Sequence, residues 1–237
     1  MTTRNNQIST QFNARAAGIL YLALVPLSFL GLIVASRIVV PGNAALTASN
    51  IIASEFQFRV SIVVTLLVQI VNIFVVLALY RLLSPVNRGM AVSMVIFILL
   101  GVPIAMLNEL NQFAVLFLLH NSNSLADFSA SQLQALVPLM LDLHQQGINI
   151  AGIFWGLWLL PMGYLVFKSG FLPKILGILL VIGGIGYLVQ SFAGLMIPSL
   201  TINIAMFTFW GEVLFPLWLL IKGVNIEAWN RWSLQTA

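Results

Sequence analysis

The chain of 237 residues contains no cysteine and very few charged residues. Without cysteine, disulfide bonds, thiolate catalysis and sulfur-ligated metal or iron–sulfur sites are all excluded. Charged residues make up only 7% of the chain, whereas a soluble domain carries about 25%. We therefore expect no soluble domain of useful size, because too few charges remain to cover one.

Six long apolar runs are present instead, and each reaches or approaches the roughly 20 residues that a helix needs to cross a bilayer. The runs are residues 16–35, 61–83, 90–119, 148–167, 175–197 and 204–221. The sequence therefore predicts an all-α fold, a six-transmembrane-helix bundle that forms a single integral membrane domain over residues 1–237. The third run would be ~45 Å long as a helix, so we expect it either to tilt strongly or to project beyond the membrane near His120.

The basic residues predict the orientation of this bundle, because they all lie near the ends of the runs. If Met1 is cytoplasmic, only Arg37 and Arg59 of the ten basic residues lie outside. The other eight are Arg4, Arg15, Arg81, Arg88, Lys168, Lys174, Lys222 and Arg231. Cytoplasmic loops are enriched in Lys and Arg, so we expect both termini in the cytoplasm. Orientation also accounts for the net charge of +4, and we expect no nucleic-acid partner.

Two segments outside the runs have the pattern of amphipathic helices. Residues 132–146 place apolar side chains on one stripe and lead into the fourth run, which predicts a short amphipathic helix before it. Near the C-terminus, Ile226, Trp229 and Trp232 are three residues apart, beside Arg231. This spacing, with tryptophan prominent, predicts an interfacial segment on the cytoplasmic surface.

Glu212 is the most unusual residue for its position, because it lies ~12 Å into the last run, near the middle of the bilayer. An ionised carboxylate there is costly unless it is paired, protonated or hydrated. We expect Glu212 to face the interior in its neutral form and to bond an amide, with three candidates on other helices: Gln69, Asn72 and Gln190. It is either a proton or ligand site, or a structural contact between helices.

Glu109 lies in the most polar stretch inside any run, Asn108-Glu-Leu-Asn-Gln112, toward the outer end of the third run. Arg59 begins the second run at the same level, so an ion pair between Glu109 and Arg59 is one expectation. Asn149 lies on a face of the fourth run that carries polar residues toward the outer membrane surface and small residues toward the inner one. Runs two to six thus each offer a polar group to a common interior. Hydrogen bonds between helices and a water-accessible cavity that opens outward both explain this pattern.

The two histidines, His120 and His144, do not predict a metal site. With Asp142 and Glu109 they supply the right ligand atoms, but a catalytic zinc site usually has three protein ligands at suitable spacing, and no such spacing occurs. The chain also has no Gly-x-Ser-x-Gly elbow and no phosphate-binding loop. We expect no metal and no cofactor, and we expect the tryptophans of the runs to be packing residues.

Several longer patterns resemble one family of bacterial membrane proteins, the domain of unknown function 4386. They are Ala17-Gly-Ile-Leu-Tyr-Leu22, residues 50–59, Leu79-Tyr-Arg-Leu-Leu-Ser-Pro-Val-Asn87, Gly156-Leu-Trp-Leu-Leu-Pro-Met-Gly-Tyr164 with its continuation to Leu180, and Gly211-Glu212 with its continuation to Asn225. The resemblance covers nearly the whole chain. It implies six membrane helices and a bacterial inner membrane, and it supplies no catalytic residues.

Three functions remain open at this point. The first is a transporter or sensor that binds a small molecule or a lipid through an outward-facing polar cavity around Glu109 and Glu212, with Gln69, Asn72, Asn149, Gln190 and Arg59 as further candidates. The second is a membrane-embedded enzyme that uses these carboxylates, with His144, as acid–base groups. The third is a structural or assembly subunit without a ligand. Membrane lipids are the partners that all three share.

Overall fold

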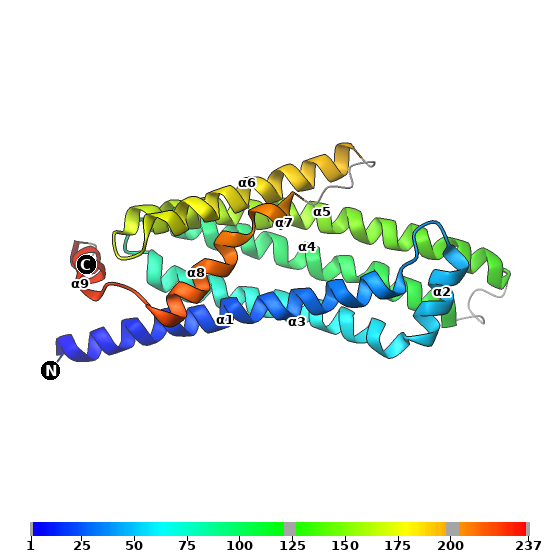
Figure 1. Ribbon diagram of the computed structural model, residues 1–237, viewed down its shortest axis with the longest axis horizontal. Helices are drawn as coiled ribbons and strands as arrows, with labels where there is room; N and C mark the ends of the chain where they lie inside the picture. The colour runs from blue at the N-terminus through cyan, green and yellow to red at the C-terminus, as the bar shows by residue number, and fades with distance from the viewer. Residues whose placement is uncertain (1, 121–126, 198–203, 236–237) are drawn as a thin grey trace.

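The computed structural model describes residues 2–120, 127–197 and 204–235, and it contains no strand within those ranges (Figure 1). The predicted all-α fold is therefore confirmed. The helices are α1 (Thr2–Ile38), α2 (Ala44–Ala53), α3 (Glu55–Leu83), α4 (Arg88–His120), α5 (Ala130–Ser169), α6 (Lys174–Met196), α7 (Ala205–Thr208), α8 (Trp210–Ile221) and α9 (Ile226–Gln235).

The long helices form a closed ring, because each packs against two neighbours. The order of contacts around the ring is α1, α3, α4, α5, α6, α8 and back to α1. Helix α2 lies at one end of the elongated bundle and α9 at the other, where the N-terminus also lies (Figure 1). A side chain that points into the ring therefore meets residues from helices that are distant in sequence.

Five helices are long and apolar enough to cross a membrane: residues Thr10–Leu30 of α1, and α3, α4, α5 and α6. The sixth predicted crossing differs from a simple helix. Residues 204–221 form α7 and α8 with a turn at Phe209, and the chain then bends by 105° into α9. At the turn, the Glu212 N–H bonds the Phe209 carbonyl three residues back, at 2.9 Å, as in a 3₁₀ turn. With this bent pair counted as one span, the bundle has six.

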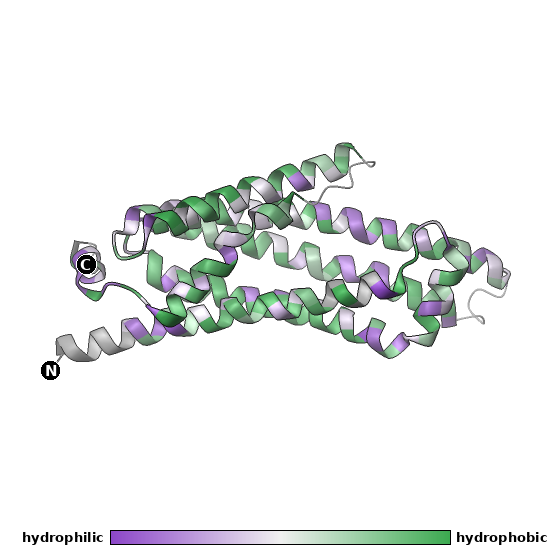
Figure 2. Cartoon of the chain, viewed as in Figure 1, coloured by the Kyte–Doolittle hydropathy of each residue, from purple (hydrophilic) through white to green (hydrophobic). Residues whose placement is uncertain are grey.

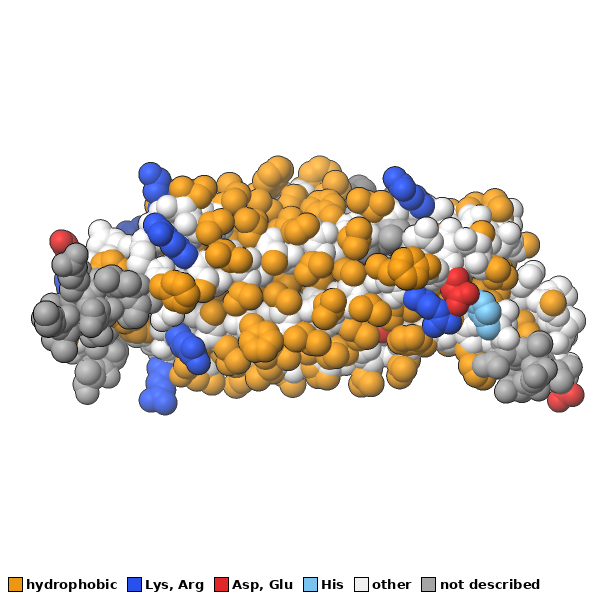
Figure 3. All heavy atoms as spheres, turned by 90° about the horizontal axis from the view of Figure 1, so that it is seen from below, with side chains coloured by type: hydrophobic (Ala, Val, Ile, Leu, Met, Phe, Trp, Pro, Cys, Tyr) orange, Lys and Arg blue, Asp and Glu red, His pale blue; other side chains and the backbone are white. Residues whose placement is uncertain are grey.

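Apolar side chains cover the outside of the bundle between two groups of basic residues (Figure 3), and hydrophilic residues gather toward its ends (Figure 2). We call one end the basic end; it carries Arg81, Arg88, Lys168, Lys174 and Lys222. The other is the distal end. Along α3, Arg59 and Arg81 are 81 − 59 = 22 residues apart, or ~33 Å. This matches a hydrocarbon core of about 30 Å.

At the distal end the helices extend beyond the level of Arg59, and we call this region the projecting part. From Arg88 to His120, α4 rises over 120 − 88 = 32 residues, or ~48 Å. The predicted amphipathic helix at 132–146 is the first part of α5, which begins after a capping box made by Ser129 and Gln132. This projecting part has its own apolar core, separate from the larger core of the ring; the small core contains Ile38, Ile51, Phe58, Ile62, Val115, Leu116 and Val137.

Glycine brings α5 and α6 close together. A Cβ atom at Gly156 would lie 2.7 Å from the Gly184 carbonyl oxygen, and one at Gly163 would lie 2.6 Å from that of Gly177. Side chains at these positions would push the helices apart, so the two backbones pack directly, as small residues allow in membrane helices.

The basic end is covered by α9, as predicted for the interfacial segment. The Trp229 Nε1–H donates to the Leu82 carbonyl at 3.1 Å, and the Trp232 Nε1–H donates to the Ser169 carbonyl at 2.7 Å. These carbonyls belong to the last turns of α3 and α5, which lack intrahelical donors. The two indoles therefore hold α9 across the ends of both helices.

Candidate functional site

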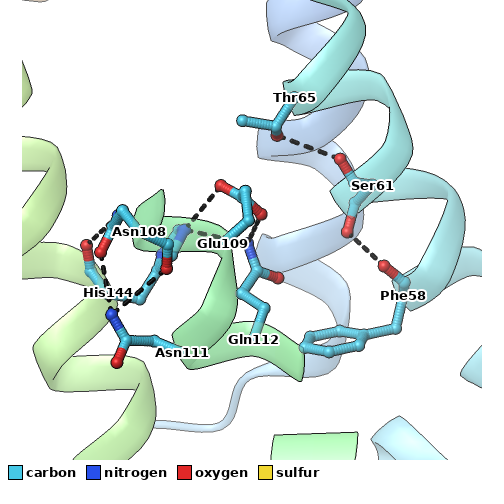
Figure 4. Close-up of polar contacts among 8 residues, drawn as sticks. All are labelled: Phe58, Ser61, Thr65, Asn108, Glu109, Asn111, Gln112 and His144. Atoms are coloured by element: carbon cyan, nitrogen blue, oxygen red, sulfur yellow. Dashed lines mark hydrogen bonds and ion pairs between the residues drawn. The ribbon is translucent and has the colours of Figure 1, made fainter. Parts of the chain in front are cut away.

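The first buried polar centre, which we call the distal cluster, consists of Asn108, Glu109, Gln112 and His144. Glu109 is 2% exposed. Its Oε1 lies 3.0 Å from His144 Nε2, and its Oε2 accepts from Gln112 Nε2 at 2.9 Å (Figure 4). Gln112 Nε2 also lies 3.0 Å from His144 Nε2, so the three side chains contact one another. The cluster therefore pairs both oxygens of a buried carboxylate.

Asn108 extends the distal cluster to the backbone of α5. Its Nδ2 donates to the His144 carbonyl at 2.8 Å, and its Oδ1 accepts from Asn111 at 3.0 Å. Asn108 also lies directly against Gly147, where a Cβ atom would overlap the amide group. The cluster thus joins α4 to α5 where the two helices leave the ring.

The expected ion pair between Arg59 and Glu109 is wrong. Arg59 Nε bonds Glu55 Oε1 at 2.7 Å, and His120 Nε2 lies 3.0 Å from Glu55 Oε2. Glu55 is one turn before Arg59 on the same helix, a spacing that favours ion pairs. The two histidines therefore approach different carboxylates, and no three potential metal ligands converge among the residues that the structure describes.

The second centre, the Glu212 cluster, consists of Glu212 with Tyr21 and Tyr187. The Tyr21 hydroxyl donates to Glu212 Oε2 at 3.1 Å, and Tyr187 lies beside the same carboxyl group. Oε1 is buried and has no hydrogen-bond partner within the described chain. Three ring helices, α1, α6 and α8, thus contribute one residue each.

The expected amide partners of Glu212 are wrong. Gln190 Oε1 instead accepts from the Ile204 N–H at 2.6 Å. Gln69 and Asn72 belong to α3, which is not a neighbour of α8 in the ring. Because α8 packs between α1 and α6, residues from those two helices reach Glu212 first. Interior placement, the other part of the expectation, agrees with the structure.

Two further aromatic rings pack against Tyr21 of the Glu212 cluster. The ring centroids of Tyr21 and Trp158 are 5.6 Å apart, and those of Tyr21 and Phe215 are 6.3 Å apart in an edge-to-face arrangement. Tyr21, Trp158 and Phe215 are all buried. These three residues belong to the larger apolar core of the ring.

Gln69 and Trp155 place two more unsatisfied atoms in the ring. Gln69 is 2% exposed, and its Oε1, like Trp155 Nε1, is buried without a partner in the described chain. Each residue lies 14 positions from the basic end of its helix, since 83 − 69 and 169 − 155 both equal 14. Both are therefore ~21 Å from that end, on α3 and α5.

Ser61, Thr65 and Asn149 have hydrogen-bond partners within the bundle. The Thr65 hydroxyl bonds the Ser61 carbonyl at 3.0 Å, and the Ser61 hydroxyl bonds that of Phe58 at 2.7 Å. Asn149 donates to Gln146 Oε1 at 3.1 Å and packs against Gly194. These two hydroxyls of α3 are therefore bonded to their own helix, as Ser and Thr often are.

Sequence reasoning missed Tyr21, Tyr187 and Trp155. All three look like ordinary apolar-run residues, and we expected the tryptophans to be packing residues. The available signal was depth: a tyrosine hydroxyl or an indole N–H in the middle of a membrane helix needs a partner.

The fold and these two centres define an integral membrane protein, a helical bundle with buried carboxylates at two depths. The chain belongs to the family described as domain of unknown function (DUF4386), whose model matches residues 16–223. A protein of Archaeoglobus fulgidus, described as uncharacterized, is 32% identical over 167 residues, which cover 70% of this chain and 86% of the relative. No solved structure matches the chain. The resemblance noted from the sequence is therefore confirmed, while a bacterial source and an inner membrane stay predictions.

Proposed function

We propose that this protein binds a small polar molecule, or a polar lipid group, in the middle of the helix ring. The observation that carries the proposal is a set of three buried polar atoms that have no partner among the described residues: Gln69 Oε1, Trp155 Nε1 and Glu212 Oε1. Buried polar atoms are nearly always bonded to protein, water or ligand. Two acceptors and one donor therefore favour a ligand with both kinds of group.

The depth of these atoms supports one binding level. Gln69 and Trp155 are ~21 Å from the basic end, and Tyr187, beside Glu212, is 187 − 174 = 13 residues into α6, or ~20 Å. Sites near the bilayer midplane, next to interrupted helices, recur in transporters. The turn at Phe209 between α7 and α8 is such an interruption.

Access from the distal side is the route that we propose. At the basic end, α9 covers the ends of α3 and α5 through Trp229 and Trp232. Tyr21, Trp158 and Phe215 fill the ring on that side. Toward the distal end, polar residues succeed one another from Gln69 to Glu109, which favours a ligand that enters there.

Small molecules that co-purify with the protein test this function. The protein would be purified in lipid nanodiscs and its bound molecules identified by mass spectrometry, first for the natural chain and then for Gln69→Leu. We expect a bound molecule in the natural chain that is absent from Gln69→Leu. Thr65→Val is the matched control, since that hydroxyl bonds its own helix. An identical set of bound molecules in the natural chain and Gln69→Leu would contradict the proposal.

We also propose that the basic end faces the cytoplasm across a cell membrane, following the distribution of Lys and Arg. The chain has no cysteine, so single introduced cysteines can be labelled without background. A membrane-impermeant maleimide added to intact cells should label Asp127→Cys, at the distal end, and spare Glu227→Cys, on α9. The reverse labelling would show the opposite orientation.

A further inference from the structure

We propose that Glu212 and the aromatic side chains around it bind a small organic ammonium ion. The inference rests on the proposed function and names the chemical class of its ligand. It starts from the charge of the site: Glu55 and Glu109 have ion-pair partners, whereas Glu212 has none within the part of the chain that the structure describes. A buried carboxylate is stable when it is neutral or faces a positive charge.

The oxygen atoms at Glu212 form an acceptor set without enough donors. Oε2 accepts from Tyr21, Tyr187 lies beside the same carboxyl group, and Oε1 has no partner within the described chain. Residue 216 is a proline inside α8, so it has no N–H for the Glu212 carbonyl four residues earlier. Oε1 therefore lacks a partner on a carboxyl group to which an organic ammonium ion brings the opposite charge.

The surroundings favour an organic cation over a bare metal ion. A metal ion such as Ca²⁺ takes six to eight oxygen ligands, whereas the groups around Tyr21 are the rings of Trp158 and Phe215. Aromatic faces attract cations through the ring quadrupole, and tryptophan does so most strongly. A carboxylate together with tyrosine and tryptophan rings is the combination that recognises alkylammonium groups.

An anionic ligand fits this place poorly. Glu212 would repel it, and the basic residues of the described helices lie near the two ends of the bundle, away from the middle (Figure 3). A neutral ligand would leave the carboxylate without a counter-charge. With Glu212 ionised, the site therefore favours a cation.

Choline and its neutral isostere provide a direct test. The thermal unfolding of the full chain in detergent would be followed with rising choline chloride, with sodium chloride at the same ionic strength, and with 3,3-dimethylbutan-1-ol, which replaces the ammonium nitrogen by carbon. We expect choline to raise the unfolding temperature and the other two to leave it unchanged. Tetramethylammonium should act like choline.

Variants test whether the stabilisation by choline depends on Glu212. Glu212→Gln keeps the shape of the side chain and removes its charge, and we expect choline affinity to fall at least tenfold. Glu212→Asp, which keeps the charge but shortens the reach, should weaken binding as well and serves if Glu212→Gln does not fold. Glu227→Gln, which removes an exposed carboxylate on α9, should respond like the natural chain.

The inference fails if no ammonium probe stabilises the protein, if the alcohol or sodium chloride stabilises it equally, or if Glu212→Gln responds like the natural chain. A neutral ligand that co-purifies in a Gln69-dependent way would then leave the proposed function intact. If neither a choline effect nor a Gln69-dependent ligand is observed, both the inference and the proposed function are wrong.

Discussion

Glu109 and Glu212 differ in how completely their carboxyl oxygens are paired. In the distal cluster, both oxygens of Glu109 have partners, from Gln112 on the same helix and His144 on α5. In the Glu212 cluster, one oxygen accepts from Tyr21 and the other has no partner in the described chain. The same chemical group thus occurs once in a completed network and once in an incomplete one.

This difference separates a structural role from a binding role. A buried polar network that is fully satisfied rigidifies the fold around it, and the distal cluster joins α4 to α5 at the edge of the ring. An incomplete network is favourable only when something else completes it. The comparison therefore assigns stability to Glu109 and ligand binding to Glu212, and the following substitutions test that division.

Glu109→Leu should have the largest effect on stability. It removes one member of a buried pair and leaves His144 and Gln112 without their acceptor, which costs about 3–5 kcal/mol in comparable cases. Thermal unfolding in detergent, compared with the natural chain, measures the loss. If Glu109→Leu destabilised the protein less than Glu212→Leu does, Glu212 rather than Glu109 would be the structural residue.

Trp229→Phe should have an intermediate effect at the basic end. It keeps the aromatic ring but removes the hydrogen bond to the Leu82 carbonyl, worth about 1 kcal/mol. We also expect tryptophan fluorescence of α9 in the natural chain to resist aqueous quenchers, because Trp229 and Trp232 are partly buried against the ring. Full quenching in the natural chain would show that α9 does not cover this end.

Glu212→Gln should change the stability of the ligand-free protein by less than about 1 kcal/mol, because an amide oxygen can still accept from Tyr21. Its effect should appear in ligand binding instead. Unfolding curves recorded with and without ligand separate the two. If Glu212→Gln destabilised the ligand-free protein as much as Glu109→Leu, Glu212 would be a structural residue.

Arg59→Gln should have the smallest effect. Its ion pair with Glu55 is exposed and formed within one helix, and such pairs contribute little in solution. The same unfolding assay should show no measurable difference. A large loss would mean that the projecting part depends on charge rather than on its small apolar core.

The sequence predicts the helices well because hydrophobicity alone decides them. The five long helices, the amphipathic start of α5 and the interfacial α9 all follow from apolar length and spacing. The interruption between α7 and α8 could not be predicted from residues 204–221, because the residues around Phe209 are mostly apolar. The local 3₁₀ bond at Phe209 depends on how this segment packs against α6.

The site could be predicted only in part, because depth follows from sequence while neighbours do not. Glu109 and Glu212 are recognisable as buried carboxylates by their positions in apolar runs. Their partners depend on the order of helices in the ring, which places α8 between α1 and α6. That order replaces the expected amides by Tyr21 and Tyr187, and it replaces Arg59 by His144.

The most direct test is a crystal structure of the protein grown in a lipid phase. Our account predicts density for a bound molecule within hydrogen-bond distance of Glu212 Oε1, and further contacts to Gln69 Oε1 or Trp155 Nε1. A structure in which these three atoms are enclosed by apolar side chains, with no density beside them, would contradict it.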